Sequence, residues 1–395
     1  MKIARVRAVV LSAPYGAALT SAENILHIPS GLRTSGFVEI TLDDGTVGLG
    51  EGYLAVFAPQ VFRSIVELLA PLLVGKDVLQ LDARFAELVV ATGYWSLQGA
   101  ARHVLSAIEI ALQDCNARLD GVPLWRHLGG MYSRPLAAYA SGGDSINPEA
   151  MQGEIDAVAA LGIRTFKIRG RAHQVDKVVW TQHAAAGIAV AVDMTQNLVV
   201  PSQRPEEVLD FVHAVVDASG RPPAFIEEAL GPDRIDDLPA LRAAAGVPIA
   251  GGEIVTTEDE LVARVRARSY DIVQPDATVI GGVGPVLEVF SAAGDVGAEV
   301  YVHCWGAGVG VLANYHAALA AGGSTVEWPL PDYPLRSELL GGLVSIVGGE
   351  VSLSNAPGLG IELTPAIERE FPFRADAVYE CLVDPTGLPT PEVWR

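Results

Sequence analysis

Short apolar runs alternate with helix-like segments through the chain from about residue 134 to residue 330. The segment 256–268, for example, opens with Glu258 and Glu260, acids that suit the first turn of a helix. This alternation predicts a parallel sheet, and eight such runs predict a (β/α)8 TIM barrel of the α/β class. The expected strands are 135–141, 164–169, 188–193, 224–228, 248–252, 271–275, 299–303 and 325–328.

The segments on either side of the barrel have different patterns. The N-terminus alternates apolar and basic positions in MKIARVRAVVLS, which predicts a half-buried strand, and a hairpin should turn at Asp44-Gly45. Residues 59–130 show helical spacing of apolar side chains. We therefore predict an α+β capping domain over 1–133, the barrel over 134–330, and a C-terminal segment, 331–395, that returns to the capping domain.

Composition limits the classes of function. The chain has 395 residues, half of them apolar, and a formal net charge of −20, which argues against nucleic acid or an anionic membrane as partner. Three cysteines without a CxxC pair make a disulfide framework or zinc site improbable. No apolar stretch is long enough to span a membrane. We expect a cytoplasmic protein. Because the charged fraction of the chain is low, we also expect a homo-oligomer.

Three acidic residues stand at the ends of strand-like runs: Asp193, Glu227 and Glu253. They lie 34 and 26 residues apart (227 − 193; 253 − 227), about one strand–helix unit at each step. In a barrel, three carboxylates spaced in this way should meet at one mouth. Three oxygen donors without a thiolate are typical of a hard divalent cation, so the sequence predicts a Mg²⁺ site.

The other expected strands also end in polar residues. Lys167 and Arg169 are two positions apart and should face the same side of their strand. Asp276 and His303 are 27 residues apart (303 − 276), one barrel unit, so the aspartate can orient the imidazole and raise its basicity. Glu327 ends the eighth strand. The mouth should therefore hold two cations, several acids and one histidine.

These motifs, in this order, resemble the enolase superfamily, and within it the mandelate racemase subgroup. The resemblance covers nearly the whole chain and rests on the segments GLGEGY, SAIEIALQDCNARLDGVPLWRHLGG, VDMTQN, FIEEA, GGE, IVQPDATVIGGV and HCWGAG. It implies that Asp193, Glu227 and Glu253 ligate one Mg²⁺, and that His303 with Asp276 is the catalytic base. Lys167 and Arg169 stand at the paired-lysine position of the subgroup. Glu327 matches an acid that hydrogen-bonds the substrate carboxylate.

The implied chemistry is removal of the proton α to a carboxylate through an enediolate intermediate. Arg169 departs from the subgroup, whose racemases carry lysine there, and arginine rarely gives up its proton. One-base dehydration of an acid sugar, aldonate or aldarate, to a 2-keto-3-deoxy acid is therefore the favoured reaction. A racemase, epimerase or cycloisomerase is the alternative within enzymes. A non-catalytic protein that binds sugar acids is the alternative outside them.

Substrate specificity should come from the capping domain. The irregular segment from Tyr15 to Ser35 has the character of an active-site lid. Candidate substrate contacts are His27, Arg33, Tyr53, Asn197 and Trp305. The expected partner is a small-molecule carboxylate, and the resemblance implies a dimer or an octamer.

Overall fold

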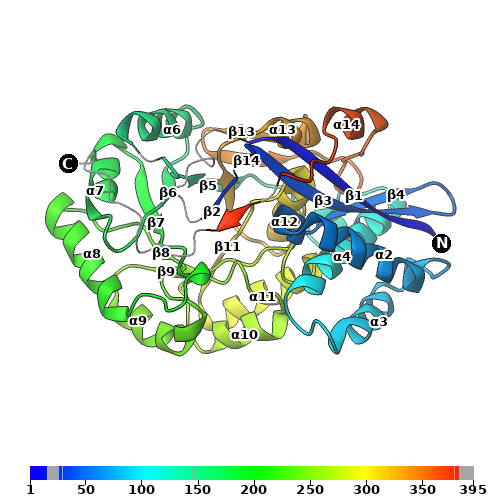
Figure 1. Ribbon diagram of the computed structural model, residues 1–395, viewed down its shortest axis with the longest axis horizontal. Coiled ribbons are helices and arrows are strands. Elements are labelled where there is room, and N and C mark those ends of the chain that lie inside the picture. The colour runs from blue at the N-terminus through cyan, green and yellow to red at the C-terminus, as the bar shows by residue number, and fades with distance from the viewer. Residues whose placement is uncertain (16–25, 29, 146, 378, 382–395) are drawn as a thin grey trace.

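The protein has two parts that lie side by side: a barrel, and an N-terminal sheet with its own helices (Figure 1). The computed structural model describes residues 1–15, 26–28, 30–145, 147–377 and 379–381.

Eight parallel strands form a closed barrel, because the last strand pairs with the first. Each expected strand is present, with ends that differ by a few residues from the prediction. The strands are β5 (Leu136–Gly142), β6 (Thr165–Arg169), β7 (Ala189–Asp193), β8 (Ile226–Glu227), β9 (Ile249–Gly251), β10 (Ile272–Val273), β11 (Glu299–Val302) and β12 (Thr325–Pro329).

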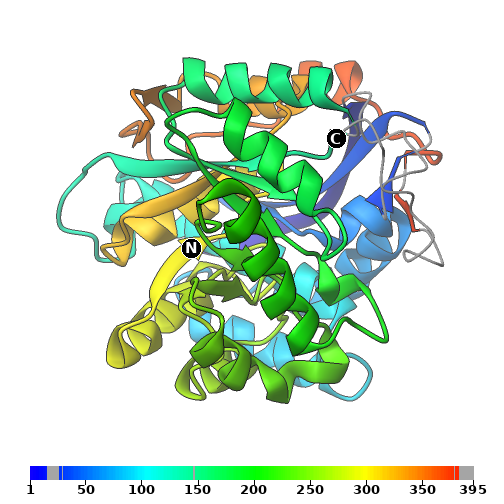
Figure 2. The same cartoon turned by 90° about the vertical axis from the view of Figure 1, so that its left-hand side faces the viewer.

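Helices cover the outside of the barrel, and Figure 2 shows the green ones on the side that faces the viewer. The principal helices are α6 (Pro148–Ala160), α7 (Val175–Ala184), α8 (Pro205–Ser219), α9 (Leu238–Ala244), α10 (Glu258–Arg266), α11 (Val283–Val296) and α12 (Gly308–Ala320). Two 3-10 turns lie in the loops, η2 (Gln196–Leu198) and η3 (Pro232–Asp237).

Aromatic side chains fill the barrel interior. Tyr139 packs edge-on against Phe225, with ring centroids 5.8 Å apart, and lies at the same distance from Tyr301. The Lys167 ammonium lies 5.6 Å from the centre of the Tyr139 ring. The barrel is thus a packed core rather than a pore, so chemistry can occur only at its mouth.

The N-terminal sheet has three antiparallel strands, β1 (Ile3–Pro14), β3 (Leu32–Leu42) and β4 (Val47–Glu51), and its hairpin turns where expected. Five helices follow: α1 (Leu54–Phe57), α2 (Pro59–Leu73), α3 (Leu81–Gly93), α4 (Ala100–Leu119) and α5 (Leu124–His127). Helix α4 lies so close to β4 that a Cβ at Gly50 would be 1.8 Å from the Ala107 carbonyl oxygen. Glycine is required there by close approach of two backbones.

The C-terminal segment follows a route that the sequence only partly predicts. After α13 (Pro334–Leu340), the hairpin β13 (Val344–Val347) and β14 (Glu350–Leu353) extends the barrel sheet by antiparallel pairing with β5, which was not expected. Helix α14 (Pro365–Glu370) then lies beside β1 and β3 (Figure 1), and Glu368 pairs with Arg7 at 2.7 Å. The short β15 (Glu380–Cys381) pairs with β2 (Leu26–His27). The boundaries at 133 and 330 stay predictions.

Within the described residues, no helix is both long and apolar enough to cross a membrane. Cys115 and Cys304 are buried free thiols.

Candidate active site

The strand register places three of the predicted residues in a row across the barrel mouth. Arg169 on β6 is paired with Asp193 on β7, and Asp193 with Glu227 on β8. Glu253 follows two residues after β9, in a turn. Parallel strands present their carboxyl ends at the same rim, and this is why residues so distant in sequence meet here.

Lys167 is the central cation of this rim. Its buried ammonium contacts a carboxylate oxygen of Glu227 and lies 2.9 Å from one of Glu327. Burial lowers the pKa of Lys167, but the charges of Glu227 and Glu327 outweigh that effect and hold the pKa well above its usual value. The two acids therefore favour the charged form of the lysine.

Arg169 is held by two acids. Its guanidinium pairs with Asp144 and lies 3.6 Å from an Asp193 oxygen, and it stacks over the Trp305 ring at 4.8 Å. Burial lowers the pKa of Arg169, yet Asp144 and Asp193 together raise it above the usual range. Arg169 cannot serve as a base.

His303 and Asp276 form the predicted contact. The imidazole Nδ1 is 2.8 Å from an Asp276 carboxylate oxygen, and both side chains are buried. The other Asp276 oxygen accepts from the backbone N–H of Thr278 at 2.8 Å and from Asn314 at 2.9 Å, so the acid is fixed. Orientation of Nδ1 leaves Nε2 facing the mouth, where it lies 3.4 Å from Glu253.

Without a bound cation, the charges around His303 favour its protonated form; a cation held by Glu253 would offset the largest of these charges and favour the neutral imidazole that a base requires. Burial lowers the pKa of the imidazole, but Glu253, Glu327 and the hydrogen bond with Asp276 together raise it to about 10. The pKa of Glu327 is shifted in the opposite direction. Burial raises the pKa of Glu327, whereas Lys167 and His303 lower it to about 2.

The three predicted metal ligands have the donor chemistry for Mg²⁺. Their mutual repulsion is visible in the pKa values: burial and then Glu253 raise the pKa of Asp193, and burial, Asp193 and Glu253 raise that of Glu227. A divalent cation would offset this repulsion. The described side chains do not contain three His, Cys, Asp or Glu already gathered as a metal site. The acids contact Lys167, Arg169 and His303 instead, so the set fits by its donor atoms and charge.

Four of the five candidate substrate contacts lie near this rim. The Tyr53 ring is 6.1 Å from the His303 ring, and Asn197 donates to Glu253 at 2.9 Å. Arg33 is buried, donates to the Trp305 carbonyl, and packs 5.8 Å from the rings of Tyr53 and Trp305. Its contacts with aromatic rings and a carbonyl make it part of the wall of the mouth. The side chain of His27 and the predicted lid positions 16–25 lie outside the described residues.

Several residues of the site were not predicted. Gln274 donates to Glu227, Asp144 pairs with Arg169, and Glu51 contacts the loop after His303. Gln274 was detectable, since it lies two positions before Asp276 on the same strand end and so faces the same side. The roles of Asp144 and Glu51 depend on pairing across distant segments, for which the sequence carries no local signal.

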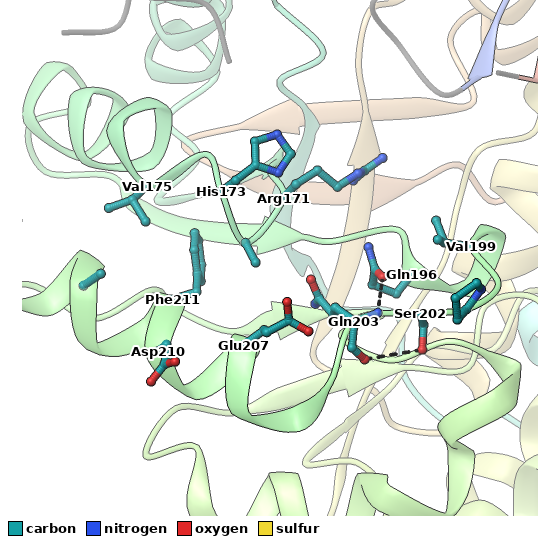
Figure 3. A pocket seen from close by; sticks show the side chains of 13 residues that line it. Arg171, His173, Val175, Gln196, Val199, Ser202, Gln203, Glu207, Asp210 and Phe211 are labelled. Carbon is teal, nitrogen blue, oxygen red and sulfur yellow. Dashed lines mark hydrogen bonds between the residues drawn. The ribbon is translucent and has the colours of Figure 1, made fainter. Parts of the chain in front are cut away.

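A cavity of about 750 Å³ lies beside this rim, outside the barrel (Figure 3). It is bounded by the loops after β6 and β7 and by α8, and Figure 3 shows Arg171, Gln196 and Gln203 along its walls. Arg171 donates to the Met194 carbonyl at 2.8 Å, one residue past Asp193. None of the predicted catalytic residues lines this cavity.

A (β/α)8 barrel with a capping domain, an imidazole–carboxylate pair and three acids at its mouth defines a class of barrel proteins. Residues 150–367 match the family described as enolase C-terminal domain-like. Residues 30–129 match the mandelate racemase / muconate lactonizing enzyme N-terminal domain. The chain belongs to this family, the mandelate racemase and muconate lactonizing enzyme group of the enolase superfamily.

Two relatives are named as enzymes of sugar acids or their lactones. The chain is 28% identical over 355 residues to D-galactarolactone cycloisomerase of Agrobacterium fabrum, covering 86% of this chain and 91% of that protein. It is 26% identical over 339 residues to arabinonate dehydratase of Saccharolobus solfataricus, covering 84% and 89%. The fold matches an L-talarate/galactarate dehydratase variant liganded with Mg and L-glucarate, at 22% identity and a TM-score of 0.80, over 94% of this chain and 92% of that one.

Proposed function

We propose that this protein is a Mg²⁺-dependent hydro-lyase that removes the proton α to the carboxylate of an acid sugar. The product would be a 2-keto-3-deoxy acid, formed from an aldonate or aldarate. The observation that carries the proposal is the His303–Asp276 contact of 2.8 Å at a barrel mouth that has no second base among the predicted catalytic residues.

His303 is the proposed base. Asp276 holds Nδ1, so Nε2 is the atom that would take the α proton and leave an enediolate. The protonated imidazole could then give a proton to the β-hydroxyl and release water. Asp276 is itself held by Thr278 and Asn314, which limits rotation of the pair.

Lys167 is the proposed donor to the substrate carboxylate, where negative charge grows during proton removal. Glu327 was predicted to share this role, but it can donate only when protonated. Lys167 and His303 outweigh the effect of burial and lower its pKa to about 2. Without substrate, Glu327 therefore holds Lys167 charged and in place, at 2.9 Å, and its hydrogen bond to the substrate carboxylate stays a prediction.

Asp193, Glu227 and Glu253 are the residues that would hold the Mg²⁺. When bound, the cation supplies positive charge that stabilises a developing enediolate. Removal of metal by EDTA should abolish turnover, and added Mg²⁺ should restore it. Full activity after exhaustive chelation would contradict the metal assignment.

Arg169 supports elimination over racemisation. Racemisation needs a base on each face of the α carbon, and Arg169, paired with Asp144 and Asp193, stays protonated. Its proposed role is electrostatic, on the side of the mouth opposite His303.

A cycloisomerase is the second candidate, supported by the similarity to D-galactarolactone cycloisomerase. One base suffices for that reaction too. A library of acid sugars and their lactones, assayed both for keto acid with semicarbazide and for loss of lactone, would separate the two. Deuterium in the α-epimer of the substrate would instead indicate a racemase. Binding of acid sugars without turnover of any would favour the non-catalytic alternative.

The natural ligand is proposed to be a small-molecule carboxylate, with Arg33, Tyr53, Asn197 and Trp305 lining its site. His27 remains a candidate contact. A homo-oligomer, dimer or octamer, also stays a prediction, which light scattering of the purified protein would test.

A further inference from the structure

Two helices of the barrel begin directly after the loops that carry His303 and Asp276, and neither helix caps itself. Helix α12 starts after Ala307, and α11 starts after Gly282. Neither residue has a side-chain oxygen to accept the unpaired N–H groups of the first turn. The acceptors come from the other domain.

Glu51, at the end of β4 in the N-terminal sheet, caps α12. Its two carboxylate oxygens accept from the N–H groups of Ala307 and Gly310, each at 2.7 Å. The side chain is 2% exposed. A Cβ at Gly306 or Gly310 would lie 3.1 Å from this carboxylate, which leaves little room for any other arrangement.

Glu109, on α4, caps α11 in the same way. Its oxygens accept from Val283 at 2.8 Å and from Gly284 at 3.2 Å. Ser106, one turn earlier on α4, accepts from Gly281 at 2.8 Å. A Cβ at Gly282 would be 1.9 Å from the Glu109 carboxylate, so the backbone approaches the acid as closely as glycine allows.

The two caps act on the same pair of side chains. Only three residues separate His303 from Ala307, whose N–H donates to Glu51. The helix that Glu51 caps also carries Asn314, which donates to Asp276 at 2.9 Å. The loop that begins with Asp276 ends at the first turn that Glu109 caps.

We propose that Glu51 and Glu109 are positioning residues through which the capping domain holds His303 and Asp276 in register. Each acid locks one loop of the pair by capping the helix that follows it. The inference rests on the proposed function for its catalytic meaning, but the clamp itself is a property of the backbone. Under this proposal, His303 and Asp276 reach their paired arrangement only when the capping domain is packed against the barrel.

Amide hydrogen exchange followed by mass spectrometry at pH 8, where burial no longer keeps Glu51 and Glu109 protonated because the pKa of each is about 7, tests the clamp on the full chain, without substrate. The substitution Glu51→Gln keeps the shape but offers one acceptor and one donor where two N–H groups need acceptors. Exchange in a peptide over 303–310 should rise about tenfold, the effect of losing one net hydrogen bond. Exchange over 278–284 should change much less. Glu109→Gln should show the reverse pattern.

Asp114→Asn is the matched control. Asp114 is a buried acid on α4 as well, but it accepts from Leu49 and Leu359 and touches neither barrel helix. Its loss should destabilise the capping domain without selective exchange at either loop. Equal exchange at both loops in all three variants, or no change at 303–310 in Glu51→Gln, would overturn the proposal.

A kinetic readout separates this proposal from the proposed function. With a substrate in hand, Glu51→Gln should lower kcat about tenfold and leave KM within about twofold, since a displaced base impairs proton transfer more than binding. Glu51→Ala should be worse, because it retains no acceptor. If the wild-type protein turns over no acid sugar, the proposed function fails while the exchange experiment still decides the clamp. Normal kcat in Glu51→Gln would reject the clamp and leave the function standing.

Discussion

The two sides of the barrel mouth handle charge in different ways. At the end of β6, Lys167 and Arg169 are each held by two carboxylates, which keep both side chains protonated. At the ends of β10 and β11, a single imidazole is oriented by Asp276. The first side is a fixed positive surface, and the second carries a group that can exchange a proton.

This difference explains why an arginine at position 169, in place of a lysine, changes the chemistry expected at the mouth. A lysine can serve as a base once burial depresses its pKa, whereas a guanidinium keeps its proton in nearly any surroundings. In the proposed assignment the mouth has one base and one electrophilic side, an arrangement that would suit elimination better than inversion of a carbon centre. Each prediction below acts on one side of this comparison.

Replacement of the exchangeable group should have the largest effect. His303→Asn should lower kcat about 10²–10⁴-fold, the usual contribution of a general base, with KM little changed. Steady-state kinetics on an acid sugar that the wild type dehydrates is the measurement. Asp276→Asn is the companion variant and should also lose rate, because the neutral amide no longer favours the required tautomer. Wild-type turnover by His303→Asn would eliminate this residue as the base.

Lys167→Met should lower turnover, because it removes the proposed donor to the substrate carboxylate, and it should also lower stability. It leaves Glu227 and Glu327 buried without their cation, and removing one partner of a buried pair costs about 3–5 kcal/mol. Urea unfolding in EDTA measures this loss. In excess Mg²⁺ the loss should shrink, since a cation at Glu227 replaces part of the missing charge. An identical loss with and without Mg²⁺ would argue that Glu227 does not face the metal.

Arg169→Lys should have a smaller effect and tests the asymmetry directly. The lysine retains the charge but loses the two-pronged contact with Asp144 and Asp193, so kcat should fall about tenfold, or about 1.4 kcal/mol. In D₂O, the wild type should form no α-inverted epimer of the substrate that carries deuterium. Such an epimer should appear only with the lysine variant. Deuterium in an inverted epimer made by the wild type would refute the one-base interpretation.

The domain interface should be visible in the dependence of stability on pH. Burial raises the pKa of Glu51 to about 7, although the N–H groups of Ala307 and Gly310 lower it in part. Its unfolded value is near 4.5, so between pH 4.5 and 7 the folded protein holds a proton that the unfolded chain has lost. This contribution to stability is complete below pH 4.5 and falls as pH rises towards 7.

Comparison of Glu51→Gln with the wild type isolates this contribution from other titrating groups. The stability of the variant relative to the wild type should rise by about 1.4 kcal/mol per pH unit across that window. Urea unfolding at pH 5, 6 and 7 measures it. A difference that stays constant with pH would mean that Glu51 has the same pKa in both states.

The barrel was predictable because its signals are local. Each strand is a short apolar run, and the strand ends that carry Asp193 and Glu227 fall one unit apart. The antiparallel addition of β14 to β5 was not predictable, since the pairing joins Val351 to Leu136 across the length of the barrel. Nothing in either segment identifies the other.

The candidate site divides in the same way. The residues at the mouth could be predicted from the sequence alone. Alternation along a strand places side chains on one face of the sheet, and the regular spacing of strand–helix units places strand ends at one rim. The hydrogen-bond and ion-pair partners of these residues became known from the folded chain: Asp144 for Arg169, Gln274 for Glu227, and Glu51 for the turn after His303. Hydrogen bonds and ion pairs depend on distances of about 3 Å between side chains. Those distances are set by how separate segments pack, and sequence spacing does not encode them.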